Sequence, residues 1–301
     1  MQRIGIYFFS LAFTLGGYIA RAGGDAKAAE LLAQARAAIG GDSKVSNVHG
    51  ISATGALQRA MGERRIDGEV TIELQLPDKL LRSDSISPMS DGAFLVTTQG
   101  INGDKPLRSS KTLNMPPGAV VRMPPPPAPG SDAELQLIRN SRAELARLSV
   151  ALLLAAPASV PLDFAYAGEA ESPDGKADVL DVKGPSSFGA KLFLDKATHR
   201  PLMLVYRGVA PRMVVQTQRG GGPPPAAAPH SERGAAPVAP AAPAQPEQVD
   251  ISMFLDDYKS VDGVMLPHHI TRSIDGKPNE EWTFKTIKLN PVFKPDTFEA
   301  R

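Results

Sequence analysis

Two pairs of residues near the C-terminal end have the clearest capacity for chemistry. His268 and His269 offer imidazole ligands for a metal, and Asp256 with Asp257 offers carboxylates for a cation. The two histidines are adjacent on a predicted strand, so their side chains point to opposite faces and cannot readily share one metal. The two aspartates are equally compatible with a solvated strand end. We therefore interpret both pairs as structural.

No other pattern in the chain indicates an enzyme. His49, His199 and His230 lie in turn-like or low-complexity stretches, with no acid and nucleophile at a recognisable spacing. The sequence contains no G-x-S-x-G, P-loop or H-E-x-x-H motif. It also contains no cysteine, which excludes disulfides, thiolate metal sites and cysteine nucleophiles. We expect a non-enzymatic protein with no catalytic residues, no metal and no cofactor.

Composition and charge describe a chain that can fold around a large core. Of its 301 residues, 42% are hydrophobic and 22% are charged, and the formal net charge is +1. No basic stripe runs along the sequence, so we do not expect nucleic acid as a partner.

The N-terminus has the layout of an export signal. Arg3 precedes an apolar run over residues 4–20, and the tripeptide that ends at Ala22 has the small-x-small form that signal peptidase recognises. We predict that residues 1–22 are a signal peptide cleaved after Ala22, which leaves an exported, periplasmic protein without a transmembrane segment. The alternative is an uncleaved membrane anchor, because the apolar run is just long enough to consider as a span.

Residues 131–156 carry the longest helical pattern of the mature chain. Ser131 and Glu134 have the S-x-x-E spacing of a capping box at its start. Apolar residues follow at helical periodicity, and from Val150 the segment is apolar on all sides until Pro157 ends it. Such a helix is expected to run into an enclosure formed by other elements. Its apolar stripe consists of Leu137, Ile138, Leu145, Leu148 and Leu152.

Most of the remaining chain has the alternation of antiparallel strands. Val70, Ile72 and Leu74 alternate with polar residues, so that one face of this strand is apolar and the other is wet. Similar segments, separated by turn sequences, bring the expected total to about eleven strands. A short helix over residues 25–39 precedes them and ends at a Gly-Gly pair.

Two proline-rich segments interrupt this pattern. Residues 114–130 are predicted to form a stiff connector into the central helix or, alternatively, a flap beside a cavity mouth. Residues 219–247 are rich in Pro, Ala and Gly and are predicted to be a disordered insertion. Both flanks of the insertion have the pattern of the same sheet, so we predict a single domain over residues 23–301.

Turn sequences in the second half of the chain form a recurring pattern. One strand ends at Asp195, a Thr-containing turn follows, and Pro201 opens the next strand. The C-terminal region continues with two hairpins. It closes with Asn290-Pro291 and with the pair Asp296 and Phe298, which are separated by one residue. This order resembles the LolA-like lipoprotein carriers, whose relatives include periplasmic sigma-factor regulators of the RseB type. The resemblance covers most of the mature chain.

The resemblance implies an α+β fold in which helices pack in the concave face of a strongly curved antiparallel sheet. Such a half-open β-barrel of about eleven strands would have the helices as a lid over a hydrophobic cavity for acyl chains. The two proline-rich segments and the greater length are departures from the family pattern.

Nine residues are the candidate lining of such a hydrophobic cavity. They are Ile72, Leu74, Leu145, Leu148, Leu152, Phe164, Tyr166, Trp282 and Phe284. Trp282 and Phe284 share a strand face and are also compatible with an ordinary core. The sequence leaves open whether the cavity is open or filled by its own side chains.

These expectations predict an exported, non-enzymatic binding protein. It would hold a lipid or the acyl chains of a lipoprotein, as a carrier or a chaperone. The alternative is an envelope sensor or assembly factor that binds a protein partner through the half-barrel and the proline-rich segments.

Overall fold

Three helices and twelve strands make up the part of the chain that the computed structural model describes. This part comprises residues 21–62, 64–87, 93–114, 127–173, 175–209 and 248–299. His230, residues 1–20 of the predicted signal peptide, the insertion at 219–247 and the middle of the segment 114–130 lie outside it. The flap and the insertion therefore stay predictions. The predicted cleavage site after Ala22 lies within the first described helix, and cleavage there stays a prediction.

The helices are α1 (Arg21–Ala38), α2 (Asp42–Ser46) and α3 (Asp132–Leu153). The strands before α3 are β1 (Gly50–Met61), β2 (Arg64–Gln75), β3 (Lys79–Ile86), β4 (Phe94–Asn102) and β5 (Lys105–Leu113). The strands after α3 are β6 (Asp163–Ser172), β7 (Gly175–Lys183), β8 (Gly189–Asp195), β9 (Pro201–Val209), β10 (Gln248–Val261), β11 (Val264–Ile274) and β12 (Lys277–Leu289).

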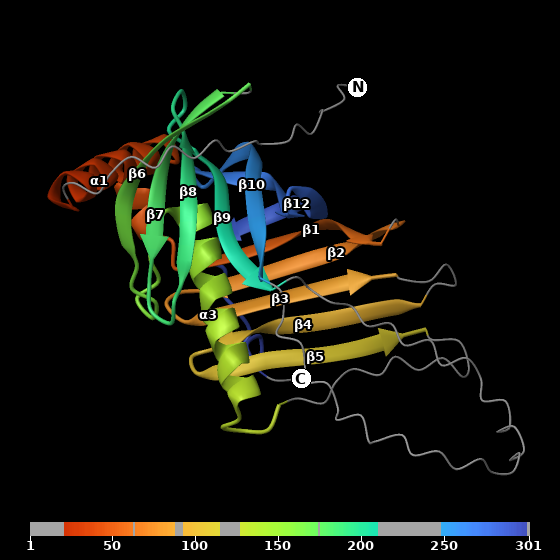
Figure 1. Ribbon diagram of the computed structural model, residues 1–301. Coiled ribbons are helices and arrows are strands. Elements are labelled where there is room, and N and C mark those ends of the chain that lie inside the picture. Colours follow the sequence, from red (N-terminus) through yellow and green to blue (C-terminus); the bar gives the residue numbers. More distant parts are fainter. Residues whose placement is uncertain are drawn as a thin grey trace, which may run out of the picture.

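All twelve strands belong to one open antiparallel sheet, in the order β5-β4-β3-β2-β1-β12-β11-β10-β9-β8-β7-β6 (Figure 1). Each strand pairs with its neighbour in sequence except at the centre, where β1 pairs with β12. This seam joins a five-stranded half to a seven-stranded half, and β5 and β6 form the two edges. Strands of both halves, β3 to β5 and β9, contact α3, so the sheet bends around this helix.

Alternation decides which face of each strand meets the helix. On β2, Val70, Ile72 and Leu74 are buried while Thr71 and Glu73 are half-buried, as the sequence pattern predicts. The buried residues of the strands form one hydrophobic core with α3 and with the inner side of α1.

The central helix has a defined start and a defined end. The Ser131 hydroxyl accepts a hydrogen bond from the Glu134 backbone N–H at 3.2 Å, while the Glu134 carboxylate accepts from the Gly130 N–H. The helix ends at Leu153, three residues earlier than predicted, because Leu154 adopts a left-handed conformation with φ of 51°. From Leu148 to Leu154 every residue is buried.

A charged side chain from α1 completes this helix end. Arg36 donates two hydrogen bonds, of 3.2 and 2.9 Å, to the Leu154 carbonyl. A cation at a helix C-terminus satisfies an orphan carbonyl and interacts favourably with the helix dipole. The sequence places these two residues 118 positions apart, so the contact also ties α1 to α3.

We expect the Arg36→Met protein to lose about 1–2 kcal/mol of unfolding free energy, because the Leu154 carbonyl then lacks its charged donor. Urea denaturation followed by circular dichroism measures this loss. Lys27→Met removes a cation of the same helix that pairs with Glu30 at the surface, and it serves as the matched control. Equal stability of the two variants would contradict a capping role for Arg36.

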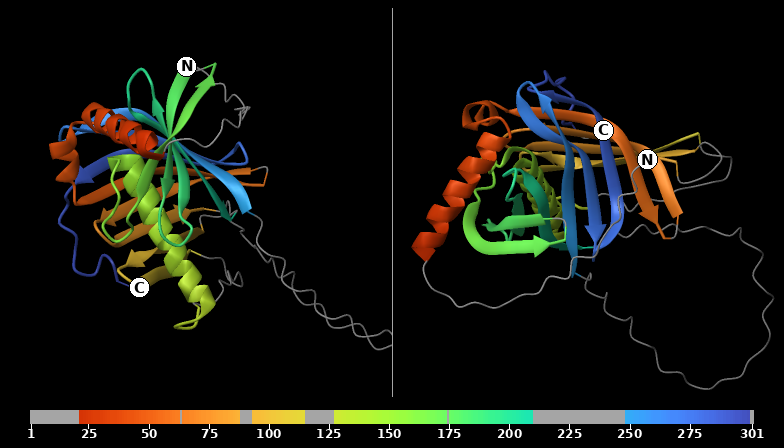
Figure 2. Two further views of the ribbon diagram at one scale, coloured as in Figure 1. Left: turned by 60° about the vertical axis from the view of Figure 1, so that its left-hand side comes forward. Right: turned by 90° about the horizontal axis from the view of Figure 1, so that it is seen from above.

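The α+β class and the open antiparallel sheet agree with the sequence prediction, but two details differ. The sheet has twelve strands and not about eleven, and the additional strand is β5. As an edge strand, β5 buries only Leu107, so it has no clear apolar alternation. Among the described helices, α3 is the one that crosses the middle of the concave face, whereas α1 packs against β6 at the edge of the sheet (Figure 2).

Candidate ligand site on the concave face

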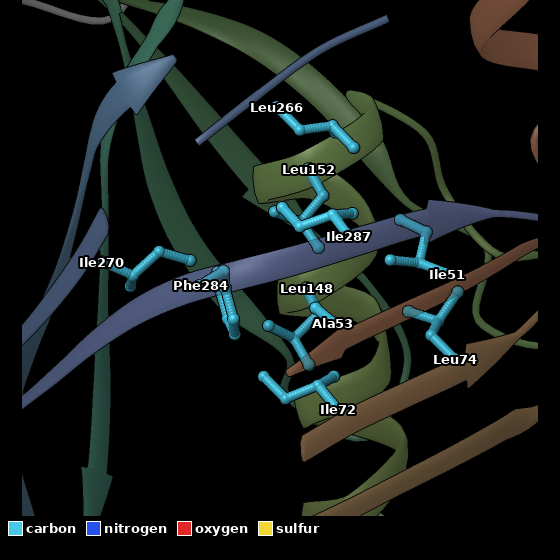
Figure 3. A pocket seen from close by; sticks show the side chains of 10 residues that line it. All are labelled: Ile51, Ala53, Ile72, Leu74, Leu148, Leu152, Leu266, Ile270, Phe284 and Ile287. Atoms are coloured by element: carbon cyan, nitrogen blue, oxygen red, sulfur yellow. The ribbon is translucent and has the colours of Figure 1, made fainter. Parts of the chain in front are cut away.

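A small apolar cavity lies where α3 crosses the central seam of the sheet (Figure 3). Its volume is about 10 Å³, close to that of a single water probe. Leu148 and Leu152 reach it from the helix, and the other lining residues come from β1, β2, β11 and β12. These are Ile51, Ala53, Ile72, Leu74, Leu266, Ile270, Phe284 and Ile287.

The volume shows that α3 lies in direct contact with the sheet. Pockets that hold small ligands usually measure about 300–1,000 Å³. The concave face is therefore filled by its own side chains at this position, and an acyl chain could enter only if α3 moved away from the seam.

The structure brings five of the nine predicted site residues together at this cavity. They are Ile72, Leu74, Leu148, Leu152 and Phe284. Leu145 and Trp282 are fully buried in the same core but do not line the cavity. Phe164 and Tyr166 lie on β6, the far edge strand, and are only half-buried. A role for any of the nine in ligand binding stays a prediction.

A network of seven charged side chains adjoins the cavity on the same face, and the sequence interpretation did not anticipate it. It consists of two groups of ion pairs, a sheet portion on β1, β3 and β12 and a helix portion on α3 and β11, and one arginine of each group lies against the Trp282 ring. Its members are Arg59, Arg82, Asp84, Glu144, Arg147, Arg272 and Glu280.

Glu280 is the centre of the sheet portion of this network. Its carboxylate accepts hydrogen bonds from Arg59 Nε at 2.8 Å and from Arg82 Nη2 at 3.0 Å. Asp84 bridges the same two arginines, with Arg82 Nε at 2.8 Å and Arg59 Nη2 at 2.5 Å. The guanidinium of Arg82 lies 4.6 Å from the ring centre of Trp282, whose indole N–H also points to Glu280.

Glu144 is the centre of the helix portion. Its carboxylate lies 3.2 Å from Arg272 Nη1 and 3.4 Å from Arg147 Nη1. Arg272 also donates to the Tyr206 hydroxyl, and Arg147 stacks on the Tyr206 ring at 3.9 Å. The Arg147 Nε atom is buried and makes no hydrogen bond within the described part of the chain.

Burial and charge have opposite effects on the acids of the network. Burial alone would raise the pKa of Glu280, but the positive charges of Arg82, Arg272 and Arg59 outweigh it and lower that pKa far below its ordinary value. The pKa of Glu144 is lowered in the same way, with burial opposed by Arg272 and Arg147. Both carboxylates are therefore ionised at neutral pH.

A local signal for the network was present in the sequence. Arg82 and Asp84 occupy the apolar phase of β3, between Leu80 and Ile86, so they must point inward with these two residues. Arg272 likewise follows Ile270 by two positions on β11. Charges in the apolar phase of a strand need buried partners.

The structure places one of the two histidines first considered as metal ligands beside a backbone carbonyl. His268 is buried and its Nδ1 lies 3.1 Å from the Leu266 carbonyl oxygen. The described residues contain no group of three or more His, Cys, Asp or Glu side chains that could hold a metal ion.

None of the described helices has the length and apolarity needed to cross a membrane.

A larger and more polar hollow lies outside the concave face, between the C-terminal segment and strands β1 to β5 and β12. Its volume is about 420 Å³, and its lining includes Ser52, Ser83, Thr98, Lys288 and Lys294. Apolar side chains such as Leu81, Val292 and Phe293 also line it, so charged, hydroxyl and apolar groups are mixed here. The concave face has a wholly apolar lining and is the better candidate for an apolar ligand.

Comparisons with known proteins give matches only among solved structures. No protein-family profile matches the sequence, and no curated protein matches it. A LolA superfamily protein from Nitrosomonas europaea is similar over 91% of this chain and 97% of its own, with 10% identity and a TM-score of 0.45. A DUF1329 family protein from Desulfovibrio piger is similar over 90% and 97%, with 10% identity and a TM-score of 0.44.

A further similar structure is the MucA/MucB complex of Pseudomonas aeruginosa, with 14% identity, coverage of 88% of this chain and 100% of that one, and a TM-score of 0.22. A LolA superfamily protein is thus among the structures similar to this chain, as the sequence resemblance led us to expect. The function proposed below rests on the residues of the concave face.

Proposed function

We propose that this chain is an exported, periplasmic binding protein without catalytic activity, which holds an acyl chain against the concave face of its sheet. The observation that carries this proposal is the continuous apolar wall under α3, to which four strands on both sides of the seam contribute. The ligand would be a lipid or the acyl chain of a lipoprotein.

Binding requires an exchange of apolar contacts. The side chains of Leu148 and Leu152 cover the wall in the structure, and an acyl chain would take their place when α3 moves outward. Each buried methylene contributes about 0.8 kcal/mol, so one long chain can offset the contacts that the helix gives up. In this view α3 is a lid, and release requires that it return to the seam.

Protein purified from a periplasmic preparation tests the proposal. Native mass spectrometry and lipid extraction should reveal a copurified lipid, and the stripped protein should take up a fluorescent fatty acid with saturation. A protein that is ligand-free from the start and takes up no fatty acid would refute it.

A protein partner is a second candidate, favoured by an exposed apolar pair at the edge of the sheet. Phe94 and Leu113 are directly opposite each other on β4 and β5 and are 40% and 51% exposed. A pull-down from envelope extract, with the full chain and with a chain lacking residues 219–247, separates the candidates. Loss of the partner on deletion, with no lipid binding by either form, would favour this second function.

A further inference from the structure

Arg272 stands where the apolar wall and the charged network meet. Leu266 and Ile270 line the cavity, and Arg272 continues the same face of β11 two residues further on. On β12, Trp282 and Phe284 are likewise two residues apart on one face. The centre of the Trp282 ring lies 5.5 Å from the Arg272 guanidinium carbon. An acyl chain that lies along this wall would therefore bring one of its ends to Arg272.

Arg272 depends on the lid helix for its counter-ion. Among the described carboxylates, Glu144 on α3 is the one that forms an ion pair with it, at 3.2 Å. Its other hydrogen-bonding partner, the Tyr206 hydroxyl, is neutral. Glu280 lies opposite Arg272 on β12 and attracts it, but the Glu280 carboxylate forms its ion pairs with Arg59 and Arg82. When α3 moves to admit a ligand, Arg272 loses this carboxylate.

With α3 and its Glu144–Arg147 pair displaced, the sheet carries one more positive than negative charge in this network. The sheet then presents Arg59, Arg82 and Arg272 against Asp84 and Glu280. A partly buried guanidinium without a counter-ion is strongly unfavourable, and a neutral ligand does not change this. A negatively charged group at the end of the ligand would give Arg272 a new counter-ion.

We propose that the ligand is an anionic amphiphile with a single acyl chain, whose carboxylate or phosphate takes the place of Glu144 on Arg272. This inference rests on the proposed function and names the ligand class of the same site. The chain lies along Ile270 and Leu266. Arg147, which contacts the same Glu144 carboxylate and has an unused buried Nε–H, supplies a second donor when the helix settles over the bound ligand.

Competition with a neutral apolar dye tests the inference on the full mature chain. Laurate, lauryl phosphate and lauryl alcohol displace bound N-phenylnaphthylamine at neutral pH and low ionic strength. We expect the two anions to bind about tenfold or more tightly than the alcohol, as a charge-assisted hydrogen bond requires. The difference between laurate and lauryl phosphate shows which headgroup the site prefers.

The outcomes separate the two proposals. Equal binding of the alcohol and both anions would overturn the inference and leave the proposed function intact. If neither the dye nor any of the three probes binds, the proposed function itself fails.

The double variant Glu144→Leu with Arg272→Met removes both members of the pair, so neither is left without the other, while Arg147 keeps its contact with the Tyr206 ring. We expect it to bind all three probes with similar affinity. Arg142→Met removes an exposed arginine of the same helix that pairs with Asp104, and it should keep the anionic preference. A double variant that still prefers the anions would overturn the inference.

Glu144→Gln gives an independent measurement, because it removes the internal competitor while Arg272 and the apolar wall stay in place. The ratio of anion to alcohol affinity should then rise several-fold above that of the natural protein. An unchanged ratio would show that Glu144 does not occupy the headgroup position.

Discussion

Replacing Glu280 by glutamine should lower the free energy of unfolding by about 3–5 kcal/mol, the usual cost of breaking a buried ion pair. The Glu280 side chain is 10% exposed and its carboxylate pairs with Arg59 and with Arg82. A neutral amide leaves both guanidinium groups with Asp84 as their remaining acidic partner in the sheet portion of the network. Urea denaturation at neutral pH, followed by the fluorescence of Trp282, measures the loss.

The neighbouring residue on β12 provides a matched control. Glu281 points to the opposite face and forms a surface pair with Arg65 at 3.1 Å. Glu281→Gln should change the free energy of unfolding by less than about 1 kcal/mol. Similar losses in the two variants would mean that the network does not stabilise the fold beyond an ordinary surface pair.

The same network predicts how stability depends on pH. Because the folded-state pKa values of Glu280 and Glu144 lie below the unfolded value of 4.5, their contribution is complete above that value and is lost as the pH falls through the folded-state pKa values. Unfolding free energy should therefore decline below about pH 4.5. The decline should be shallower in Glu280→Gln, which no longer has that carboxyl group to protonate. Urea curves recorded at a series of acidic pH values measure both slopes.

Leu148→Ala should have the second large effect, a loss of about 3–5 kcal/mol of unfolding free energy. Leu148 is 1% exposed and lines the cavity under α3. Truncation adds the volume of the missing side chain to that cavity and weakens the contact of the helix with the seam. If α3 is a lid, the variant should also bind N-phenylnaphthylamine more tightly than the natural protein, as fluorescence titration would show.

Leu135→Ala is the control for this variant, because Leu135 lies on the same helix and is 44% exposed. It should leave both the stability and the dye affinity nearly unchanged. A large loss of stability in Leu148→Ala without any change in dye binding would show that Leu148 is simply a core residue, and the lid interpretation would fail.

Local patterns were sufficient for most of the secondary structure. The capping spacing of Ser131 and Glu134, the apolar run that follows Val150, and the alternation on β2 each depend on neighbours within a few residues. The same dependence on local pattern explains why the edge strand β5 is not predicted: with one buried residue, it has almost no apolar alternation.

Local periodicity also predicted part of the apolar lining of the candidate site. Ile72, Leu74, Leu148, Leu152 and Phe284 were identified as inward-facing from their periodicity, and they meet at the cavity. Phe164 and Tyr166 have the same kind of pattern but lie on β6, because periodicity indicates which face a residue occupies and not which other strands share its neighbourhood.

The amino-acid sequence by itself determined the two long helices, most strands and the apolar face of each, but not the short helix α2. Only the tertiary structure decided that this face is interrupted by a charged network and that its cavity is filled. Arg59 and Glu280 are 221 residues apart, and they meet because β1 pairs with β12 in one register. Glu144 meets Arg272 across 128 residues because α3 crosses that seam. Such contacts depend on strand pairing and helix packing, which local periodicity does not encode.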